Sequence, residues 1–324
     1  MVRLLKSHHP DFISGEEISK SLGLSRAAVW KTAKKLQSLG YKIRSKPKLG
    51  YRLESRSRLL LPWEITDGLQ TETIGRKIYY FDKINSTQNF ALDLASKPHE
   101  NGSLVIAERQ TRGRGRQNRR WVSPSGGIWL SILLKPNFEI SQASLFPMVT
   151  SLSLSLAIEK MLSLEPKLRW PNDVTLDGKK VAGILVDGSI ESNKIDYLVI
   201  GVGINFKVSP KEISNKITGR SYGVTSLVGK DSEANPVQFL QQFLLELEGM
   251  YYKMISGSIS GIRHEWEKRS STIGKNVKIL TPGGRVVGRA VGISDDGSLL
   301  VRSNHKTRKV MVGDILQQSG SNRA

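Results

Sequence analysis

Three apolar runs in the middle of the chain limit its fold more than any other feature. They cover residues 127–134, 181–187 and 197–203, and none carries a charge before its final position. Short uninterrupted runs of this kind are typical of strands buried on both faces of a sheet. Residues 78–81 and 103–108 are also rich in β-forming side chains. Residues 88–94 have helical character, and residues 145–164 have the apolar spacing of a buried helix of about 20 residues. The region is therefore predicted to be a mixed sheet with helices packed against it.

Length and composition exclude several classes of protein. A chain of 324 residues is long enough for two or three domains. The absence of cysteine excludes disulfides, thiol catalysis and cysteine-ligated metal centres. Five histidines, of which only His8 and His9 are adjacent, do not favour a histidine metal site. No run approaches the roughly 18 apolar residues of a transmembrane helix, and residues 1–10 lack a signal-peptide core. We therefore expect a cytoplasmic protein with no membrane partner.

The positive charge is concentrated at the two ends of the chain. Of the net charge of +20, residues 1–60 carry +10, from 14 Lys or Arg against 4 Asp or Glu. Residues 271–324 carry +6, from 9 against 3. A concentrated positive field favours a polyanionic partner, with nucleic acid as the first candidate. A basic but merely solvated surface would look the same, so charge alone does not decide.

Residues 14–53 have the pattern of a winged helix-turn-helix. Ser14 and Ser25 are each placed to cap a helix, and Gly23 and Gly40 follow the two helical segments. Alternating runs at 41–45 and 50–53 predict a hairpin, with a basic wing at 46–49. The residues predicted to face a DNA major groove are Ser25, Arg26, Trp30, Lys31 and Lys34. A small packing domain with solvated lysines is the alternative, and Trp30 could equally belong to its core. Residues 55–58 are polar and charged and predict a linker.

Residues 110–121 combine glycine, arginine and tryptophan in one short segment. Glycine allows the backbone N–H groups to approach a ligand closely, and arginine presents a fork that matches carboxylate or phosphate. The segment holds Arg112, Gly113, Arg114, Gly115, Arg116, Arg119, Arg120 and Trp121. It is predicted to be a loop that folds over a nucleotide-like anion. It is not a P-loop, because no Gly-Lys-Ser/Thr follows.

A second polar cluster lies at residues 169–180. Asp177-Gly178 between two apolar runs predicts a hairpin turn that presents Lys179 and Lys180. The residues alone do not decide whether Lys180 is a snorkelling edge side chain or a positioned charge. Asn172 and Asp173 could bind Mg²⁺ or a ribose, and an Asx turn explains them nearly as well. Residues 201–205 end a strand with two glycines and Asn205.

Taken together, these motifs resemble those of the biotin–protein ligases, in the bifunctional form that also represses the biotin operon. The resemblance covers nearly the whole chain. It rests on the helix-turn-helix, on Asn85-Ser86-Thr87, on Gly113-Arg114-Gly115-Arg116 followed by Trp121, on Trp170-Pro171-Asn172-Asp173, on residues 180–185 and on Gly203-Ile204-Asn205. The Gly-Arg-Gly-Arg and Trp-Pro-Asn-Asp motifs are specific as a pair, whereas either alone would be weak.

The resemblance implies an α+β multidomain fold and a two-step reaction. Residues 1–60 are expected to form the DNA-binding winged helix, 61–270 an α/β catalytic domain, and 271–324 an SH3-like barrel. The barrel expectation agrees with short strands at 276–280, 285–293, 298–301 and 309–311. Biotin and ATP would give biotinyl-5′-adenylate with the help of Mg²⁺. Biotin would then pass to a lysine of a biotin carboxyl carrier protein, a subunit of acetyl-CoA carboxylase.

The resemblance also implies a role for each motif residue. Lys180 and Arg116 would be catalytic, with Asp173 near Mg²⁺. Biotin would be bound by Ser86, Thr87, Gln88, Gln110, Arg114, Gly115, Arg116 and Lys180. ATP and the adenylate would contact Arg116, Arg119, Trp121, Asn172, Lys180 and Asn205, and the pocket strand would carry Gly126, Gly127, Trp129 and Ser131. Three positions depart from the usual family residues: Asn85 for Asp, Arg169 for Lys and Asp187 for Glu. Neither Arg169 nor Asp187 is expected to touch a catalytic residue.

The remaining expectations concern partners. The adenylate would act as corepressor, and a homodimer formed through an edge strand of the central sheet would bind paired operator half-sites. The barrel could help to bind ATP or the carrier, or could simply stabilise the fold. Two alternatives stay open: a biotin-sensing repressor without ligase activity, and a lipoate-type ligase.

Overall fold

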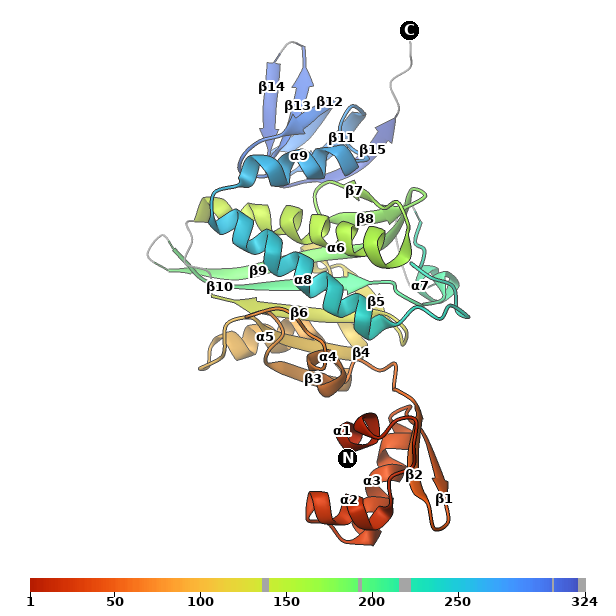
Figure 1. The fold of residues 1–324 in the computed structure, drawn as a ribbon. Coiled ribbons are helices and arrows are strands. Elements are labelled where there is room, and N and C mark those ends of the chain that lie inside the picture. The colour runs from red at the N-terminus through yellow and green to blue at the C-terminus, as the bar shows by residue number, and fades with distance from the viewer. Residues whose placement is uncertain (136–139, 192–193, 216–222, 305, 320–324) are drawn as a thin grey trace. The chain divides into compact units, whose positions relative to one another are not determined.

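The computed structural model describes residues 1–135, 140–191, 194–215, 223–304 and 306–319 (Figure 1). The chain divides into two compact units, Met1–Glu64 and Ile65–Ala324. The short helix α4 (Pro62–Thr66) contains the division.

The first unit is a winged helix. It contains α1 (Val2–Ser7), α2 (Gly15–Leu22), α3 (Arg26–Ser38) and the antiparallel pair β1 (Lys42–Lys46) and β2 (Gly50–Ser55). Ser14 and Ser25 cap α2 and α3 by accepting from the backbone N–H groups of Glu17 and Ala28. The predicted caps are therefore confirmed, and they satisfy donors that a helix N-terminus otherwise leaves open.

The burial pattern along α3 shows whether Trp30 belongs to the core. Val29, Ala33 and Leu36 are buried and face the core of the unit, whereas the Trp30 side chain is 53% exposed. The alternative that places Trp30 in the core is therefore wrong. Ser57, in the predicted linker, is buried and its hydroxyl donates to the backbone oxygen of Leu39.

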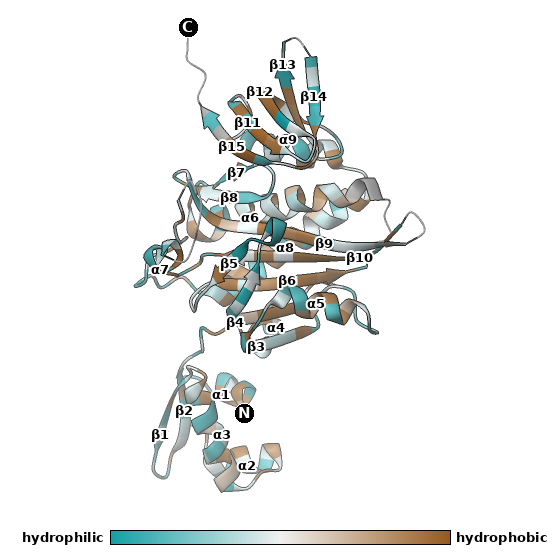
Figure 2. Ribbon diagram, turned by 180° about the vertical axis from the view of Figure 1, so that it is seen from behind, coloured by the Kyte–Doolittle hydropathy of each residue, from teal (hydrophilic) through white to brown (hydrophobic). Residues whose placement is uncertain are grey.

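An eight-stranded sheet forms the centre of the second unit. Its order is β3-β4-β6-β10-β9-β8-β7, and β5 pairs with β4 off this path. All pairs are antiparallel except β3–β4. The strands are β3 (Ile78–Ile84), β4 (Ser103–Arg114), β5 (Arg120–Ser123), β6 (Ile128–Leu134), β7 (Lys167–Arg169), β8 (Asp173–Leu176), β9 (Lys179–Glu191) and β10 (Lys194–Ile204). The three predicted apolar runs lie in β6, β10 and β9, which are consecutive in the sheet (Figure 2); β6 is buried throughout, whereas β9 and β10 are buried in part.

Helices cover both faces of this sheet. α5 (Thr87–Ala95) packs on one face, where Ala91 meets Val105, Leu133 and Val199. On the other face lie α6 (Phe146–Leu162) and α8 (Pro236–Ile255) (Figures 1 and 2). The remaining helices are α7 (Pro210–Ser214), α9 (Ile259–Arg269), and the 3₁₀ turns η1 (Arg116–Asn118) and η2 (Ile140–Leu145). The predicted mixed sheet with packed helices is confirmed.

The prediction of a loop over residues 110–121 is largely wrong. β4 continues to Arg114, the tight turn η1 follows, and β5 returns alongside it with Gly113 opposite Trp121. The physical reason is that the backbone groups of 110–114 pair with β5, a partner that the glycines and arginines do not reveal locally. The arginines therefore project from a two-stranded extension of the sheet.

The C-terminal residues form a five-stranded antiparallel sheet in the order β14-β13-β12-β11-β15, the fold expected of the barrel. Its strands are β11 (Asn276–Thr281), β12 (Gly284–Ile293), β13 (Leu299–Ser303), β14 (Lys306–Val310) and β15 (Asp314–Ser319). The sequence patterns indicate the first four strands but miss β15, because its residues are mostly polar and β15 pairs with the distant β11.

One helical stretch among the described residues is a candidate membrane span by length and composition alone. Ala143–Leu162 is long and apolar enough, by length and composition, to cross a bilayer, and 67% of its apolar 18-residue window is buried inside the protein. Apolar side chains of α6 such as Leu152 and Leu154 are fully covered. Burial of this kind identifies α6 as a core helix that passes the same test.

Candidate active site

Lys180 lies at the start of β9, held between an acid and an aromatic ring. Asp177 and Gly178 both have positive φ, as the predicted turn requires, and the turn delivers Lys180 into the sheet. The Lys180 Nζ lies 2.6 Å from Asp173 Oδ1 and 5.1 Å from the centroid of the Trp121 ring. The Lys180 side chain is 23% exposed. The choice left open by the sequence is thereby decided: Lys180 is a positioned charge.

Two glycines make room for the Trp121 ring. A Cβ on Gly203 would lie 2.4 Å from the indole, and one on Gly183 would lie 2.9 Å from it. These glycines belong to β10 and β9, so the ring rests directly on the backbone of the central sheet. The indole Nε1 is buried, as is the Oδ1 of Asn205, and neither has a hydrogen-bond partner among the described residues. Two such buried polar atoms are available to a ligand.

Arg116 links the central sheet to the C-terminal sheet. Its guanidinium donates to Asn172 Oδ1 at 3.0 Å and to the backbone oxygen of Gly313 at 3.2 Å, and it lies 3.7 Å from Asp314. Burial lowers the pKa of Arg116, and the carboxylates of Asp314 and Asp173 oppose that shift. An arginine stays charged in such surroundings, so a fixed cation faces the Asn172 side of the site.

Three of the predicted biotin-binding side chains join Ser131 of the predicted pocket strand in one hydrogen-bond network. Gln110 Oε1 accepts from the Thr87 backbone N–H at 2.8 Å and from its hydroxyl at 3.2 Å. Ser131 Oγ lies 3.0 Å from Thr87 Oγ1 and 2.9 Å from Gln88 Oε1. Ser131, Thr87 and Gln88 are buried. The network forms a polar patch in an otherwise apolar sheet, as needed for a ligand with one polar edge.

Arg114 and Gln88 share an acceptor that the sequence did not indicate. The Arg114 guanidinium lies 3.4 Å from Asp187 Oδ2, and Gln88 Nε2 donates to the same oxygen at 3.2 Å. Arg114 also donates to Asn89 Oδ1 at 3.1 Å. Asp187 therefore contacts two predicted biotin-binding residues. In the sequence, the position of Asp187 at the end of an apolar run was the one signal that pointed to it. The sequence did not show that β4 and α5 approach Asp187.

Other predicted site residues are exposed or make contacts that serve the fold. Arg119 is 60% exposed and pairs with Asp314. Ser86 caps α5, accepting from the Asn89 N–H at 3.4 Å. The Gly115 N–H donates to the Arg119 oxygen at 2.7 Å, which closes the turn between β4 and β5. Asn205 donates through Nδ2 to the Thr225 oxygen at 3.1 Å.

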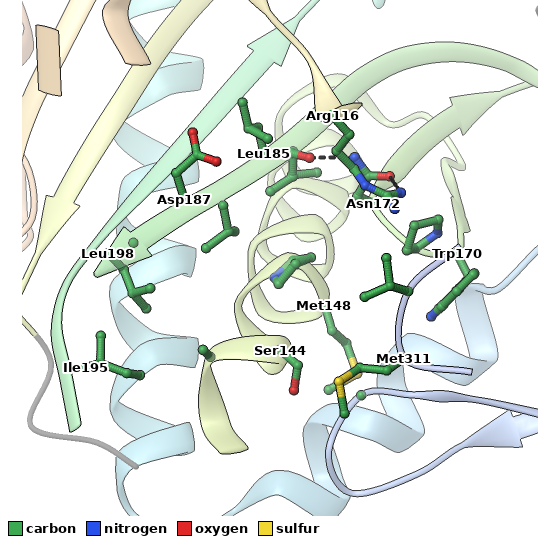
Figure 3. Close-up of a pocket in the computed structure, with 18 of the residues that line it drawn as sticks. Arg116, Ser144, Met148, Trp170, Asn172, Leu185, Asp187, Ile195, Leu198 and Met311 are labelled. Atoms are coloured by element: carbon green, nitrogen blue, oxygen red, sulfur yellow. Dashed lines mark hydrogen bonds between the residues drawn. The ribbon is translucent and has the colours of Figure 1, made fainter. Parts of the chain in front are cut away.

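A cavity of about 360 Å³ adjoins the Arg116 side of the site (Figure 3). It is lined by Arg116, Asn172, Asp187, Met148, Trp170 and Met311, among others. A second cavity of about 420 Å³ lies beside Gln110, Trp121 and Ser123. Lys180 lines neither of these two cavities.

The exposed face of α3 is the candidate nucleic-acid interface of the first unit. Ala27, Trp30, Lys31 and Lys34 are exposed at helical spacing, and the Lys34 Nζ lies 5.9 Å from the Trp30 ring centroid. Arg26 is exposed but bonds to Glu16 at 2.8 Å, and Ser25 is used as the helix cap. Trp30, Lys31 and Lys34 therefore form, together with Ala27, an exposed stripe that holds three of the five predicted DNA-binding residues.

The described residues contain no group of three or more His, Cys, Asp or Glu that could hold a metal ion. Asp173 is the one acidic side chain beside Lys180 within the described part of the site. Mg²⁺ in nucleotide enzymes is commonly held by one or two carboxylates together with substrate phosphates. A single carboxylate at Asp173 is compatible with that mode of binding.

Comparison with known proteins agrees with this geometry. The Biotin/lipoate A/B protein ligase family matches residues 80–205, an HTH domain matches 1–52, and the Biotin protein ligase C terminal domain matches 272–316. The chain is 33% identical to the Bifunctional ligase/repressor BirA of Bacillus subtilis over 97% of both chains. It is 27% identical to that of Escherichia coli, over 95% of this chain and 94% of the other.

A solved structure supports the same assignment. The biotin protein ligase from Aquifex aeolicus in complex with biotin and ATP has a TM-score of 0.61 and 27% identity, covering 76% of this chain and 100% of that one. The winged helix, the mixed sheet and the C-terminal sheet each have a matching family. The chain therefore belongs to the biotin protein ligases, in their bifunctional ligase/repressor form.

Proposed function

We propose that Lys180 and Arg116 activate biotin in an ATP-dependent ligase reaction. A biotin carboxylate oxygen attacks the α-phosphorus of ATP, which forms biotinyl-5′-adenylate and releases pyrophosphate. Negative charge grows on the oxygens around that phosphorus, and a fixed cation that needs no reorganisation stabilises it. The observation that carries this proposal is the placement of Lys180 between Asp173 and Trp121, over the glycines of the central sheet.

The proposed substrate contacts follow the arrangement of the side chains. Ser86, Thr87, Gln88, Gln110, Arg114 and Gly115 bind biotin, with the buried Thr87–Gln110–Ser131 network facing its polar edge. Trp121, Asn172, Asn205 and Arg119 bind the nucleotide, and the buried orphan atoms of Trp121 and Asn205 gain partners there. Asp173 would hold Mg²⁺, which would neutralise phosphate charge when bound.

In the second step the acceptor is a lysine of a biotin carboxyl carrier protein. Its ε-amine attacks the acyl carbon of the mixed anhydride, an amide forms, and AMP leaves. The cation that stabilised the first step also stabilises the oxygen on the departing phosphate.

The first unit is proposed to bind operator DNA, with the adenylate as corepressor. Homodimerisation would pair two winged helices with two half-sites. The proposed dimer edge is the outer side of β9. β8 pairs with β9 only as far as Gly183, so from Leu185 onward that side has no strand partner among the described residues. Sedimentation with biotin and ATP should give a dimer, and equal sedimentation with and without them would count against it.

We place the protein in the cytoplasm, where biotin, ATP, the carrier and DNA meet. The test of the function is ATP–pyrophosphate exchange with biotin or lipoate as the acid. Exchange with biotin alone supports the proposal. Exchange with lipoate alone identifies a lipoate-type ligase, and biotin binding without exchange identifies a sensor without catalysis.

A further inference from the structure

Asp187 joins two elements that reach the biotin site from different parts of the chain. Arg114 ends strand β4, and Gln88 lies in the first turn of α5. Asp187 belongs to β9, and a single carboxylate oxygen faces both of them, at 3.4 Å from Arg114 and 3.2 Å from Gln88. Its side chain is 28% exposed, so water screens these contacts only in part.

The contact with Gln88 helps to fix which way its amide points. Gln88 Nε2 donates to the Val199 backbone oxygen at 3.0 Å and to Asp187, which uses both of its N–H groups. The Oε1 atom is thereby turned toward Ser131, 2.9 Å away. Gly201 permits this position, because a Cβ there would lie 2.4 Å from Oε1. Ser131 also lies within hydrogen-bond distance of Thr87, so the orientation of the Gln88 amide affects the position of Thr87 as well.

The contact with Arg114 supplies the only charged partner of that guanidinium among the described residues. Its other partner is the neutral amide of Asn89, at 3.1 Å. The ion pair with Asp187 restrains the guanidinium from a second side, so loss of the carboxylate would leave Arg114 held by Asn89 alone and freer to adopt other rotamers. Gly115 follows directly and provides no side chain to restrain it.

We propose that Asp187 is a positioning residue for biotin, acting through Arg114 and Gln88 without touching the reacting atoms. The inference rests on the proposed biotin site, and it assigns a role to a position that departs from the usual family residue. Its expected effect is on the capture of biotin rather than on the chemical step. It therefore predicts a change in KM for biotin at nearly constant kcat.

Asp187→Asn tests this, because it removes the charge and keeps the shape. In biotin-dependent ATP–pyrophosphate exchange, we expect KM for biotin to rise about tenfold, with kcat and KM for ATP within about twofold of wild type. Asp187→Glu should restore most of the affinity. The matched control is Asp196→Asn, which removes an exposed carboxylate from the neighbouring strand β10 and should leave KM unchanged.

Three outcomes would overturn the inference. One is an unchanged KM for biotin in Asp187→Asn. Another is a fall in Tm and kcat together in both Asp187 variants, which marks a structural role. The third is an equal effect of Asp196→Asn. Arg114→Gln separates this failure from failure of the site: if it raises KM for biotin while Asp187→Asn does not, only the role of Asp187 is lost. If neither variant changes KM, the biotin site itself is misplaced.

Discussion

The Arg116 guanidinium lies 3.7 Å from the Asp314 carboxylate, so the C-terminal sheet contacts an arginine of the proposed catalytic centre. Asp314 begins β15, and its neighbour Gly313 accepts a second bond from Arg116 at 3.2 Å. Arg119 pairs with the same carboxylate. These contacts favour a role for the C-terminal sheet in the site itself. They argue against the alternative that the sheet only stabilises the fold.

Replacement of Asp314 by Asn should weaken adenylate formation about tenfold, because two arginines would lose their shared counter-charge and repel each other. Initial rates of ATP–pyrophosphate exchange measure this. Asp295→Asn is the control, since Asp295 is an exposed acid of the same sheet region that pairs with Arg263. A normal rate in Asp314→Asn would show that the contact does not support catalysis.

Arg116→Gly should release the adenylate into solution. The substitution removes the cation that bonds Asn172 and Gly313 beside the site, so the intermediate dissociates before transfer and modifies lysines unselectively. The measurement is labelling of an unrelated protein in the presence of biotin and ATP. Arg112→Gly, which changes an exposed arginine of β4, should label no more than wild type. Unchanged release from Arg116→Gly would contradict the assignment.

Trp30→Ala and Lys34→Ala should weaken operator binding in different ways. Lys34 is expected to contact phosphate, so its loss should reduce the slope of log affinity against log salt by about 1. Trp30 is uncharged, so its loss should lower affinity and leave that slope unchanged. Because Trp30 is 53% exposed, Tm should change little. If Trp30→Ala bound operator DNA with normal affinity, Trp30 would not be part of the interface.

Asp296 should make stability depend on pH in the acid range. Burial raises the pKa of Asp296, but hydrogen bonds from Ser294 and Ser298 outweigh that effect and hold the pKa at about 2. A carboxyl with a lowered pKa stabilises the fold above its usual range, and the contribution is lost as the pH falls from about 4 to about 2. Asp296→Asn should therefore lower Tm at pH 6 and have little effect at pH 2. An equal loss at both pH values would contradict this.

The sequence correctly predicted those features that depend only on neighbouring residues, such as helix caps and tight turns. Ser14 and Ser25 cap their helices, and Asp177-Gly178 forms its turn, because each residue acts on the backbone within three positions. The glycine and arginine pattern also indicated a segment whose arginines the structure places beside Asn172, Asp187 and Asp314. It did not reveal that residues 110–114 extend a strand, since that depends on pairing with β5.

The missed contacts have a common cause. Asp187 and Asp314 contact predicted site arginines, yet neither belongs to a compact motif. Asp187 reaches Arg114 because β9 and β4 belong to the same sheet, with β6 and β10 between them. Asp314 reaches Arg116 only because the start of β15 lies against the turn η1, which carries Arg116. Such contacts follow from topology, which local spacing does not encode.

The most direct test of the account compares Lys180→Ala with Lys179→Ala in biotin-dependent ATP–pyrophosphate exchange. The two lysines are neighbours at the start of β9, but Lys179 is exposed whereas Lys180 lies 2.6 Å from Asp173. Loss of Lys180 should reduce exchange by at least about a hundredfold with a folded protein, and loss of Lys179 should have little effect. Exchange that persists in Lys180→Ala at the wild-type rate would contradict the proposed catalytic centre.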